Sequence, residues 1–234
     1  MSYKDDILIN IYNSKINDIN TKISDLAIIA INNTDSEIEG NYFFSLSSDG
    51  SDKITLKYKQ ANLYFCSYNS DLNICEIGFN AGFSSLLLLL ARKNIKSTNL
   101  LIFDIGEHKY VKPCLEYIKN NFENNNNDIK TSINYIEGNS ITTVPDFINN
   151  NSSLIGTFDL IHIDGGHTYE CILNDIKNAD ILLKKNGVII IDDTNIDFID
   201  KLVTQYILSE NYIEIFLFDL SKCLSPHRII KKIK

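Results

Sequence analysis

The sequence has no long apolar run and carries little positive charge. Its longest apolar stretches, such as residues 83–91, are far shorter than the roughly 20 residues that a membrane-spanning helix needs. Residues 1–6 are polar, unlike a secretory signal. The 22 Lys and Arg residues are outnumbered by 30 Asp and Glu, and a net charge of −8 argues against a broad nucleic-acid surface. We therefore expect neither a membrane nor a nucleic acid as partner.

The cysteines do not form the pairs that a disulfide framework requires. There are five, an odd number, and they are widely spaced, mostly within apolar stretches: Cys66, Cys75, Cys114, Cys171 and Cys223. They are typical of small buried hydrophobic residues rather than of disulfides or a metal cluster. This favours a reducing compartment, and we expect a cytoplasmic protein. The 234 residues, 44% of them hydrophobic, suffice for one domain with a substantial core.

Strand and helix patterns alternate along most of the chain, which predicts an α/β fold with a parallel sheet covered by helices on both faces. Residues 1–52 are expected to form an N-terminal helical cap segment, with an extended piece at 42–46, before the main domain at 53–234. Residues 124–127 read as a polar surface loop. A turn at 225–226 would make the last strand antiparallel. Residues 5–31 are expected to form one long helix or a broken pair. Further helices are expected near 53–68, 84–93, 110–122, 141–149, 168–183 and 196–208, and strands at 73–77, 100–104, 133–137, 158–164, 187–192, 212–218 and 228–233.

A glycine turn after the first core strand is the first candidate for a binding site. Residues 75–82 read Cys-Glu-Ile-Gly-Phe-Asn-Ala-Gly, so the strand breaks at Gly78 and a helix opens after Gly82. Glycines let backbone N–H groups approach a ligand at a helix N-terminus. Asp104 ends the next strand, where a carboxylate can accept hydrogen bonds from both hydroxyls of a ribose. These features predict a nucleotide-type ligand, although the glycines alone could make only a tight turn.

The residue at the centre of the turn discriminates between cofactors. A dinucleotide site usually has a central glycine that lets the backbone approach a pyrophosphate, and this chain has Asn80 there. The turn therefore favours S-adenosylmethionine over NAD, which stays open as an alternative. The candidate cofactor residues are Glu76, Gly78, Phe79, Asn80, Gly82, Asp104, Asn139, Ser140 and Asp164.

Acidic residues at the ends of the fourth and fifth strands form a second candidate site. Asp164 ends one strand, and Asp192 and Asp193 end the other. Adjacent strands lie roughly 4.8 Å apart, so these carboxylates can meet, and oxygen ligands suit Mg²⁺. His167 follows Asp164 closely enough to act as a general base over the same cleft. The plainer interpretation is that the two adjacent acids cap a helix and that His167 lies on a loop.

His162 differs from His167, because apolar strand residues surround it and predict a packed core histidine.

Three segments carry a resemblance to a known family. Residues 76–82, 104–110 and 158–170, the last reading Phe-Asp-Leu-Ile-His-Ile-Asp-Gly-Gly-His-Thr-Tyr-Glu, resemble class I S-adenosylmethionine-dependent methyltransferases of the macrocin O-methyltransferase-like family. The resemblance covers about 53–220. It implies a three-layer, Rossmann-like, seven-stranded methyltransferase sheet with the last strand inserted antiparallel, and an N-terminal segment that shapes the acceptor pocket or a dimer contact. Phe83 departs from the histidine that the family often has there.

The resemblance also implies roles for the second site. Asp164, Asp192 and Asp193 would hold Mg²⁺, and His167 would be the base. Catechol O-methyltransferase-like enzymes place a similar metal site at the same strand ends. The resulting prediction is a Mg²⁺-dependent O-methyltransferase acting on a hydroxyl of a small molecule, a sugar or a phenolic. The alternative is a non-catalytic partner or sensor protein that only binds S-adenosylmethionine, and a homo-oligomer could form through the N-terminal helices.

Overall fold

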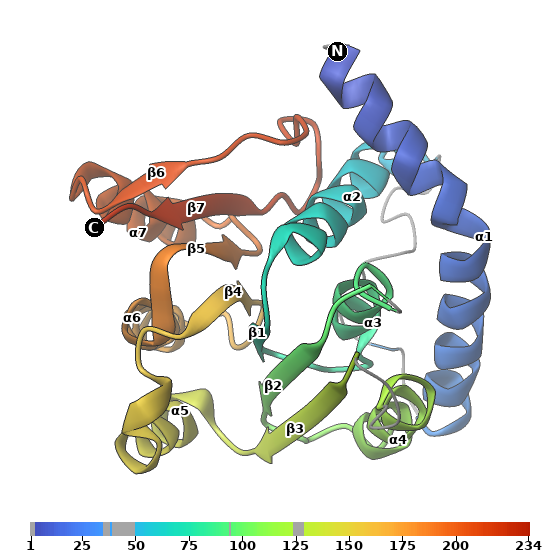
Figure 1. Ribbon diagram of the computed structural model, residues 1–234, viewed down its shortest axis with the longest axis horizontal. Helices are drawn as coiled ribbons and strands as arrows, with labels where there is room; N and C mark the ends of the chain where they lie inside the picture. Colours follow the sequence, from blue (N-terminus) through green and yellow to red (C-terminus); the bar gives the residue numbers. More distant parts are fainter. Residues whose placement is uncertain (1–2, 35–37, 39–49, 94, 124–128) are drawn as a thin grey trace.

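The structure is a computed structural model that describes residues 3–34, 38, 50–93, 95–123 and 129–234. The extended piece expected at 42–46 and the polar loop expected at 124–127 lie outside these residues. Figure 1 shows a central sheet with helices on both sides. None of the helices within the described ranges combines the length and the apolar character that crossing a membrane requires.

A seven-stranded sheet in the order β3-β2-β1-β4-β5-β7-β6 forms the middle layer. Strand β7 is antiparallel to both of its neighbours, while the other pairs are parallel. This confirms the predicted methyltransferase-type sheet with an inserted antiparallel last strand. The strands are β1 (Asn73–Ile77), β2 (Thr98–Asp104), β3 (Thr131–Glu137), β4 (Phe158–Ile163), β5 (Leu183–Ile191), β6 (Tyr212–Glu214) and β7 (Arg228–Lys232).

Two groups of helices cover the two faces of the sheet (Figure 1). Successive strand residues point to opposite faces, so Ile74 joins the core under the first group while Cys75 joins the core under the second. The first group is α1 (Tyr3–Asn32), α2 (Lys53–Asn69), α3 (Phe83–Leu90) and α4 (Val111–Phe122). The second is α5 (Ser140–Asn150), α6 (Tyr169–Leu182) and α7 (Asp197–Leu208), with the short 3-10 turn η1 (Ser152–Leu154) after α5.

The strand register brings the predicted site residues into one row. Ile77 pairs with Phe103 on one side and with Ile163 on the other, and Ile163 pairs with Ile191. The residues that follow these four strand positions are Gly78, Asp104, Asp164 and Asp192. Because the strands are parallel, all four lie at the carboxyl edge of the sheet, where ligands bind in open α/β folds.

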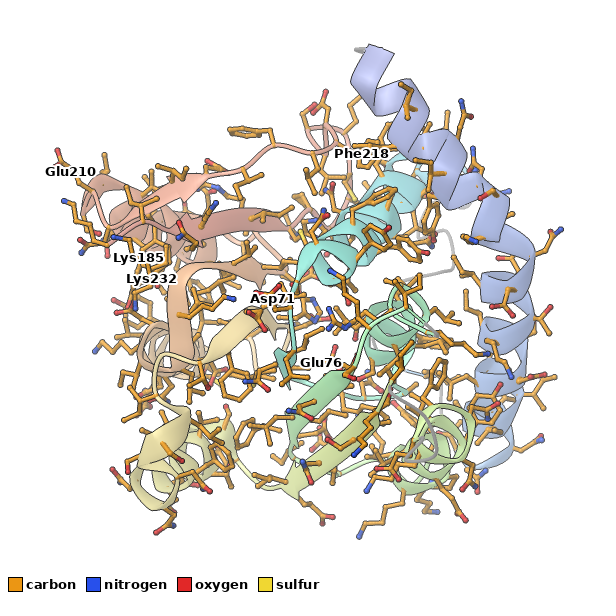
Figure 2. The ribbon with its side chains drawn as sticks, in the orientation of Figure 1. Asp71, Glu76, Lys185, Glu210, Phe218 and Lys232 are labelled. Carbon is orange, nitrogen blue, oxygen red and sulfur yellow. The ribbon has the colours of Figure 1, made fainter. Side chains whose placement is uncertain are left out.

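Two strands differ from the sequence prediction. Strand β6 ends at Glu214 instead of reaching Phe218, because the chain leaves the sheet and Phe218 stacks on Tyr58 of α2, with ring centroids 5.3 Å apart. Figure 2 shows Phe218 beside this helix. Strand β5 begins at Leu183, directly after α6, and its pairing with β4 shifts register at Phe158.

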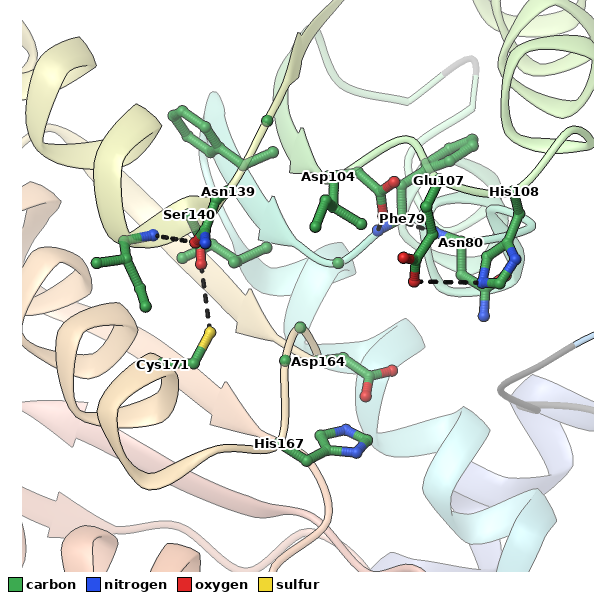
Figure 3. A pocket seen from close by; sticks show the side chains of 18 of the residues that line it. Phe79, Asn80, Asp104, Glu107, His108, Asn139, Ser140, Asp164, His167 and Cys171 are labelled. Carbon is green, nitrogen blue, oxygen red and sulfur yellow. Dashed lines mark hydrogen bonds and ion pairs between the residues drawn. The ribbon is translucent and has the colours of Figure 1, made fainter.

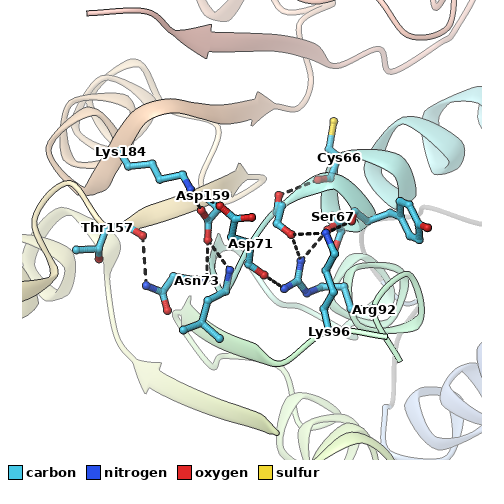
Figure 4. A network of polar contacts seen from close by, with 12 residues as sticks. Cys66, Ser67, Asp71, Asn73, Arg92, Lys96, Thr157, Asp159 and Lys184 are labelled. Carbon is cyan, nitrogen blue, oxygen red and sulfur yellow. Dashed lines mark hydrogen bonds and ion pairs between the residues drawn. The ribbon is translucent and has the colours of Figure 1, made fainter. Parts of the chain in front are cut away.

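Polar contacts close the opposite edge of the sheet (Figure 4). Arg92, which is fully buried after α3, donates from Nη1 to the carbonyl oxygens of Ser67 and Ser70, each at 2.8 Å. Asp159 Oδ2 accepts hydrogen bonds from the N–H groups of Leu72 and Asn73 at 2.7 Å. These contacts fix the end of α2 against the start of β1. They leave the carboxyl edge of the sheet as the place for a ligand.

Candidate active site

A cavity of about 490 Å³ lies at the carboxyl ends of β1, β2 and β4 (Figure 3). Its size is within the range of small-molecule sites in proteins. Eight of the residues predicted from the sequence line it, namely Gly78, Phe79, Asn80, Asp104, Asn139, Ser140, Asp164 and His167. Four predicted residues, Glu76, Gly82, Asp192 and Asp193, are not part of its lining. Glu107, His108, Thr168 and Cys171 line the cavity as well, and the sequence analysis did not select them.

The glycine turn has the backbone that the sequence predicted. Gly78 has a φ of +97°, and a Cβ there would lie 2.0 Å from the carbonyl oxygen of Asp164. The turn can approach β4 this closely only because residue 78 has no side chain. Gly82, with a φ of +80°, is the left-handed residue that precedes α3, and a Cβ there would collide with Phe79 and Ile118. Gly82 therefore shapes the turn without facing the cavity.

Asp104 organises the same turn. Its Oδ2 accepts hydrogen bonds from the N–H groups of Phe79 at 2.7 Å and Asn80 at 3.0 Å, and its Oδ1 accepts one from Gly106 at 2.7 Å. Figure 3 shows Asp104 beside Phe79 and Asn80. Asn80 adopts a φ of +50°, which asparagine tolerates better than most residues. The carboxylate thus has a structural task in addition to any contact that it makes with a ligand.

Glu76 lies beneath the cavity and not in its lining. It is fully buried near the centre of the molecule (Figure 2), where it accepts a hydrogen bond from Ser85 and contacts His162 Nδ1 at 3.1 Å. Burial would lower the pKa of His162, but Glu76 outweighs this effect and raises it. Glu76 is therefore not part of the cavity lining, and its predicted contact with the cofactor stays a prediction. His162 is fully buried, which confirms the expectation of a core histidine.

The end of β3 contributes the opposite wall of the cavity. Asn139 is the N-cap of α5, and its side-chain oxygen accepts a hydrogen bond from the N–H group of Ile141 at 3.0 Å. Ser140 Oγ lies 3.5 Å from Cys171 Sγ of α6 (Figure 3). Asn139, Ser140 and Ile141 at the capped start of this helix therefore line the cavity.

Two acids at the neighbouring strand ends have opposite pKa shifts. Burial raises the pKa of Asp164 to about 7, and the nearby Asp192 carboxylate adds to the increase. Burial also acts to raise the pKa of Asp193, but hydrogen bonds from His167 and Ser225 outweigh it and lower the value to about 2. Asp193 is therefore held in its ionised form.

His167 and Asp193 form a hydrogen-bonded pair at the cavity. His167 Nε2 lies 2.8 Å from Asp193 Oδ2, while the half-exposed imidazole lines the cavity beside Asp164 (Figure 3). The hydrogen bond to Asp193 raises the pKa of His167, although partial burial acts in the opposite direction. A carboxylate that accepts a hydrogen bond from Nε2–H leaves Nδ1 free to take a proton. The pair therefore has the geometry of a base held by an orienting acid.

Lys59 of α2 is the main residue of this cluster that the sequence analysis missed. Its Nζ lies 2.7 Å from Asp192 Oδ1, and the two side chains are only 4% and 3% exposed. The sequence does contain a signal, since Leu56, Lys59 and Leu63 recur at the spacing of one helix face, and both leucines are buried. A lysine on a buried helix face usually has a carboxylate partner.

The potential metal ligands form two overlapping sets. One consists of His162, Asp164 and Asp192, and the other of Asp164, His167 and Asp193, with the ligand atoms of each set within 4.8 Å of one another. Within the described part of the chain, the three carboxylates predicted to share one ion do not form such a set.

Comparison with known proteins identifies the family. The sequence profile of the methyltransferase domain family matches residues 75–194, which include the glycine turn, Asp104, Asp164, His167 and the acid pair. The chain belongs to this methyltransferase domain family. No curated protein sequence matches the chain.

Solved structures share the fold of this methyltransferase domain at low sequence identity. An O-methyltransferase from Bacillus cereus in complex with SAH is 16% identical, with a TM-score of 0.55 over 92% of this chain and 90% of the other. The SAH-bound methyltransferase PaMTH1 from Podospora anserina is 17% identical, with a TM-score of 0.51 over 81% and 83%. The cofactor-bound protein Rv0187 from MTB is 14% identical, with a TM-score of 0.55 over 91% and 89%. These structures confirm the fold.

Proposed function

We propose that this methyltransferase uses S-adenosylmethionine to methylate a hydroxyl group of a small molecule. The observation that carries the proposal is the His167–Asp193 pair, 2.8 Å apart, at the edge of a cavity whose other wall is the glycine turn. A protein that only binds a cofactor has no need of an oriented base there. The SAH named for the Bacillus cereus and Podospora anserina structures agrees with this choice of cofactor.

The cofactor is proposed to occupy the part of the cavity between β1, β2 and β3. Asn80 stands where a pyrophosphate-binding turn has glycine, which favours a ligand without a pyrophosphate. Asp104 would accept hydrogen bonds from the ribose while holding the turn, and Asn139 and Ser140 would present the N-terminus of α5. Phe79 and Gly78 would contribute backbone and apolar contacts.

The acceptor hydroxyl would lie between His167 and the methyl group. Its oxygen attacks the methyl carbon, the carbon–sulfur bond breaks with its electron pair remaining on sulfur, and the products are a methyl ether and S-adenosylhomocysteine. His167 Nδ1 takes the hydroxyl proton, while Asp193 stabilises the imidazolium that forms. The cavity would have to hold the acceptor oxygen, the methyl carbon and the sulfur in line, and such positioning is the main contribution of a protein to this kind of displacement. A sugar or phenolic hydroxyl would suit this chemistry.

The residues present do not fit the predicted Mg²⁺ site. Carboxylate oxygens are suitable ligands, but Asp192 is paired with the Lys59 ammonium, and both oxygens of Asp193 accept hydrogen bonds, from His167 and Ser225. Asp192 and Asp193, which would share the ion with Asp164, are therefore already paired with other side chains of the protein. We derive no step through a metal.

Calorimetry with S-adenosylhomocysteine tests the cofactor half of the proposal. The wild-type chain should bind it, and Asp104→Ala should weaken binding roughly 10- to 100-fold, because a charged hydrogen-bond acceptor is lost. Asp197→Ala, which removes an exposed carboxylate on α7, serves as the control and should bind normally. Tighter binding of NAD than of S-adenosylhomocysteine would contradict the proposal.

Turnover of S-adenosylmethionine with a panel of hydroxylated acceptors tests the catalytic half. His167→Ala should keep its affinity for S-adenosylhomocysteine and lose activity by on the order of a hundredfold or more. A variant that loses cofactor affinity as severely as Asp104→Ala would show that His167 belongs to the cofactor site. Wild-type chain that binds the cofactor but methylates none of the acceptors would favour a binding or sensor protein.

A further inference from the structure

The protein itself supplies a cation, the ammonium of Lys59, to the carboxylates at the ends of β4 and β5. Lys59 Nζ lies 2.7 Å from Asp192 Oδ1 and 3.4 Å from Ser225 Oγ, and both charged side chains are almost fully buried. Lysine is rarely buried to this degree unless its charge is paired. Lys53, in the first turn of the same helix, is exposed. Of these two lysines of α2, the fold therefore places Lys59 against the acids.

The ammonium of Lys59 and the carboxylate of Asp192 are in direct contact, and almost no solvent reaches either side chain. Removing a charged pair from water is costly, and only close contact with hydrogen bonds offsets the cost. Asp192 Oδ1 meets that condition, because it also accepts a hydrogen bond from the N–H group of Asp193 at 2.8 Å.

Ser225 extends the effect of Lys59 to the base. Its hydroxyl contacts Lys59 Nζ and donates a hydrogen bond to Asp193 Oδ1, while Asp193 Oδ2 faces His167. The segment that carries Ser225 is held in place, because Pro226 accepts hydrogen bonds from the N–H and hydroxyl groups of Thr194, each at 2.9 Å. One continuous chain of contacts thus runs from Lys59 to the imidazole that lines the cavity.

We propose that Lys59 is the resident cation of this carboxylate cluster and takes the place that a divalent metal would occupy. It neutralises the crowded acids and keeps Asp193 oriented toward His167. Lys59 acts on the reaction through these partners, so it is a positioning residue and not a catalytic one. This inference rests on the proposed function for its effect on turnover, whereas its effect on metal binding is independent of that function.

Titration calorimetry with Mg²⁺ and Mn²⁺ on the full chain tests the proposal directly. The wild-type protein should show no binding at the cluster, and dialysis against EDTA should leave its methyl transfer unchanged. Lys59→Met removes the ammonium from a cluster of acids and should create a site, seen as binding heat and as a rise in melting temperature with either ion. Lys53→Met removes an exposed lysine of the same helix and should behave as wild type in every assay.

Turnover adds a readout that metal binding does not give. Without added metal, Lys59→Met should lose activity roughly 10- to 100-fold, as expected for a residue that positions the acid holding the catalytic base. Lys59→Arg keeps the charge and should recover part of the loss without creating a metal site.

Two results would overturn the proposal. The first is wild-type protein that binds Mg²⁺ at the cluster or loses activity in EDTA. The second is folded Lys59→Met that keeps full activity and gains no metal site. If Lys59→Met does not fold, the wild-type titration and EDTA treatment decide the question. Failure of the wild-type chain to bind S-adenosylhomocysteine would instead overturn the proposed function, and the metal titration could still be interpreted.

Discussion

At the scale of single residues, the environment of each side chain decides its chemistry more than its type. Asp164 and Asp193 are both carboxylates at the same edge of the sheet, yet burial raises the pKa of one and hydrogen bonds lower that of the other. His162 and His167 differ in the same way, since Glu76 holds the first in the core and the second lines the cavity. The type of a residue thus indicates that it could take part in catalysis, and the residues around it determine whether its charge and position allow this.

The pH dependence of activity follows from the His167–Asp193 pair. His167 must be neutral to take a proton, and the hydrogen bond to Asp193 raises its pKa above the ordinary 6.5. We therefore expect kcat/KM to fall with decreasing pH, and the midpoint of this fall should lie above pH 6.5. Asp193→Asn removes the negative charge, so the acid limb should move to lower pH while the plateau drops more than about tenfold. A pH–rate profile of both proteins measures the shift.

The control for this variant is Asp197→Asn, which changes an exposed carboxylate at the start of α7. It should leave the profile unchanged. An acid limb that does not move in Asp193→Asn would show that His167 is not the group that titrates.

The thiols should differ sharply in reactivity. Burial raises the pKa of Cys66 and of Cys114 to about 12, and it also raises those of Cys75 and Cys171. Cys223 is only half-buried. Because the thiolate is the reactive form, iodoacetamide at neutral pH should label Cys223 first in the native protein and all five cysteines after denaturation. Cys223→Ser should remove the fast label, and equally rapid labelling of Cys171 would contradict the prediction.

At the scale of elements, the glycine turn depends on close approach as well as on backbone conformation. Gly78→Ala places a Cβ against the carbonyl oxygen of Asp164, which belongs to a rigid strand end. We expect a loss of at least about 2 kcal/mol in the free energy of unfolding, measured with urea. Gly156→Ala is a matched control, because its φ is +66° but no atom of the residues that the structure describes lies within 4 Å of the added Cβ. Equal losses in the two variants would show that the contact with β4 does not matter.

Helix α1 is packed into the core and does not simply rest on the surface. Tyr12, Ile19 and Leu26 are buried in the same cluster as α3 and α4, and Tyr12 Oη donates a hydrogen bond to Gln60 at 3.0 Å. Leu26→Ala should cost roughly 2–5 kcal/mol of unfolding free energy in urea denaturation, because it leaves a cavity. Ile28→Ala, at an exposed position of the same helix, should cost less than about 0.5 kcal/mol.

The same packing bears on the predicted boundary between residues 52 and 53, which stays a prediction. Deleting residues 1–32 should leave a chain that does not fold cooperatively, because a large apolar surface of α3 and α4 would be exposed. A truncated chain with wild-type stability would support an independent domain at 53–234.

At the scale of the whole molecule, the hydrophobic cores on the two faces of the sheet share the same strands. A ligand at the carboxyl edge of this sheet should therefore stabilise both cores. S-adenosylhomocysteine at about 100 times its dissociation constant should raise the free energy of unfolding by about 2.7 kcal/mol, in a single transition. Calorimetric melting with and without the ligand measures this change. Two separate transitions, of which only one shifts, would show that the two helical layers unfold independently.

Much of the fold could be predicted because alternation of strands and helices is a local pattern. The bounds predicted for β1 agree with the structure, and the other strands were found within a few residues except at β5 and β6. Those two deviate for tertiary reasons, since β5 includes a register shift against β4 and the end of β6 is drawn toward Tyr58. Neither contact can be predicted from the local conformational preferences of the residues.

The residues that end the strands could be predicted without the fold, because hydrophobic periodicity and the positions of glycines are local features of the sequence. That was enough to select Gly78, Asp104, Asp164 and His167, all of which line one cavity. How the charges of the acids are balanced depends on the folded arrangement. Lys59 is distant in sequence from the acids and reaches Asp192 because α2 packs beside the end of β5. Electrostatic energy depends on distance in space, and a sequence without its fold does not supply that distance.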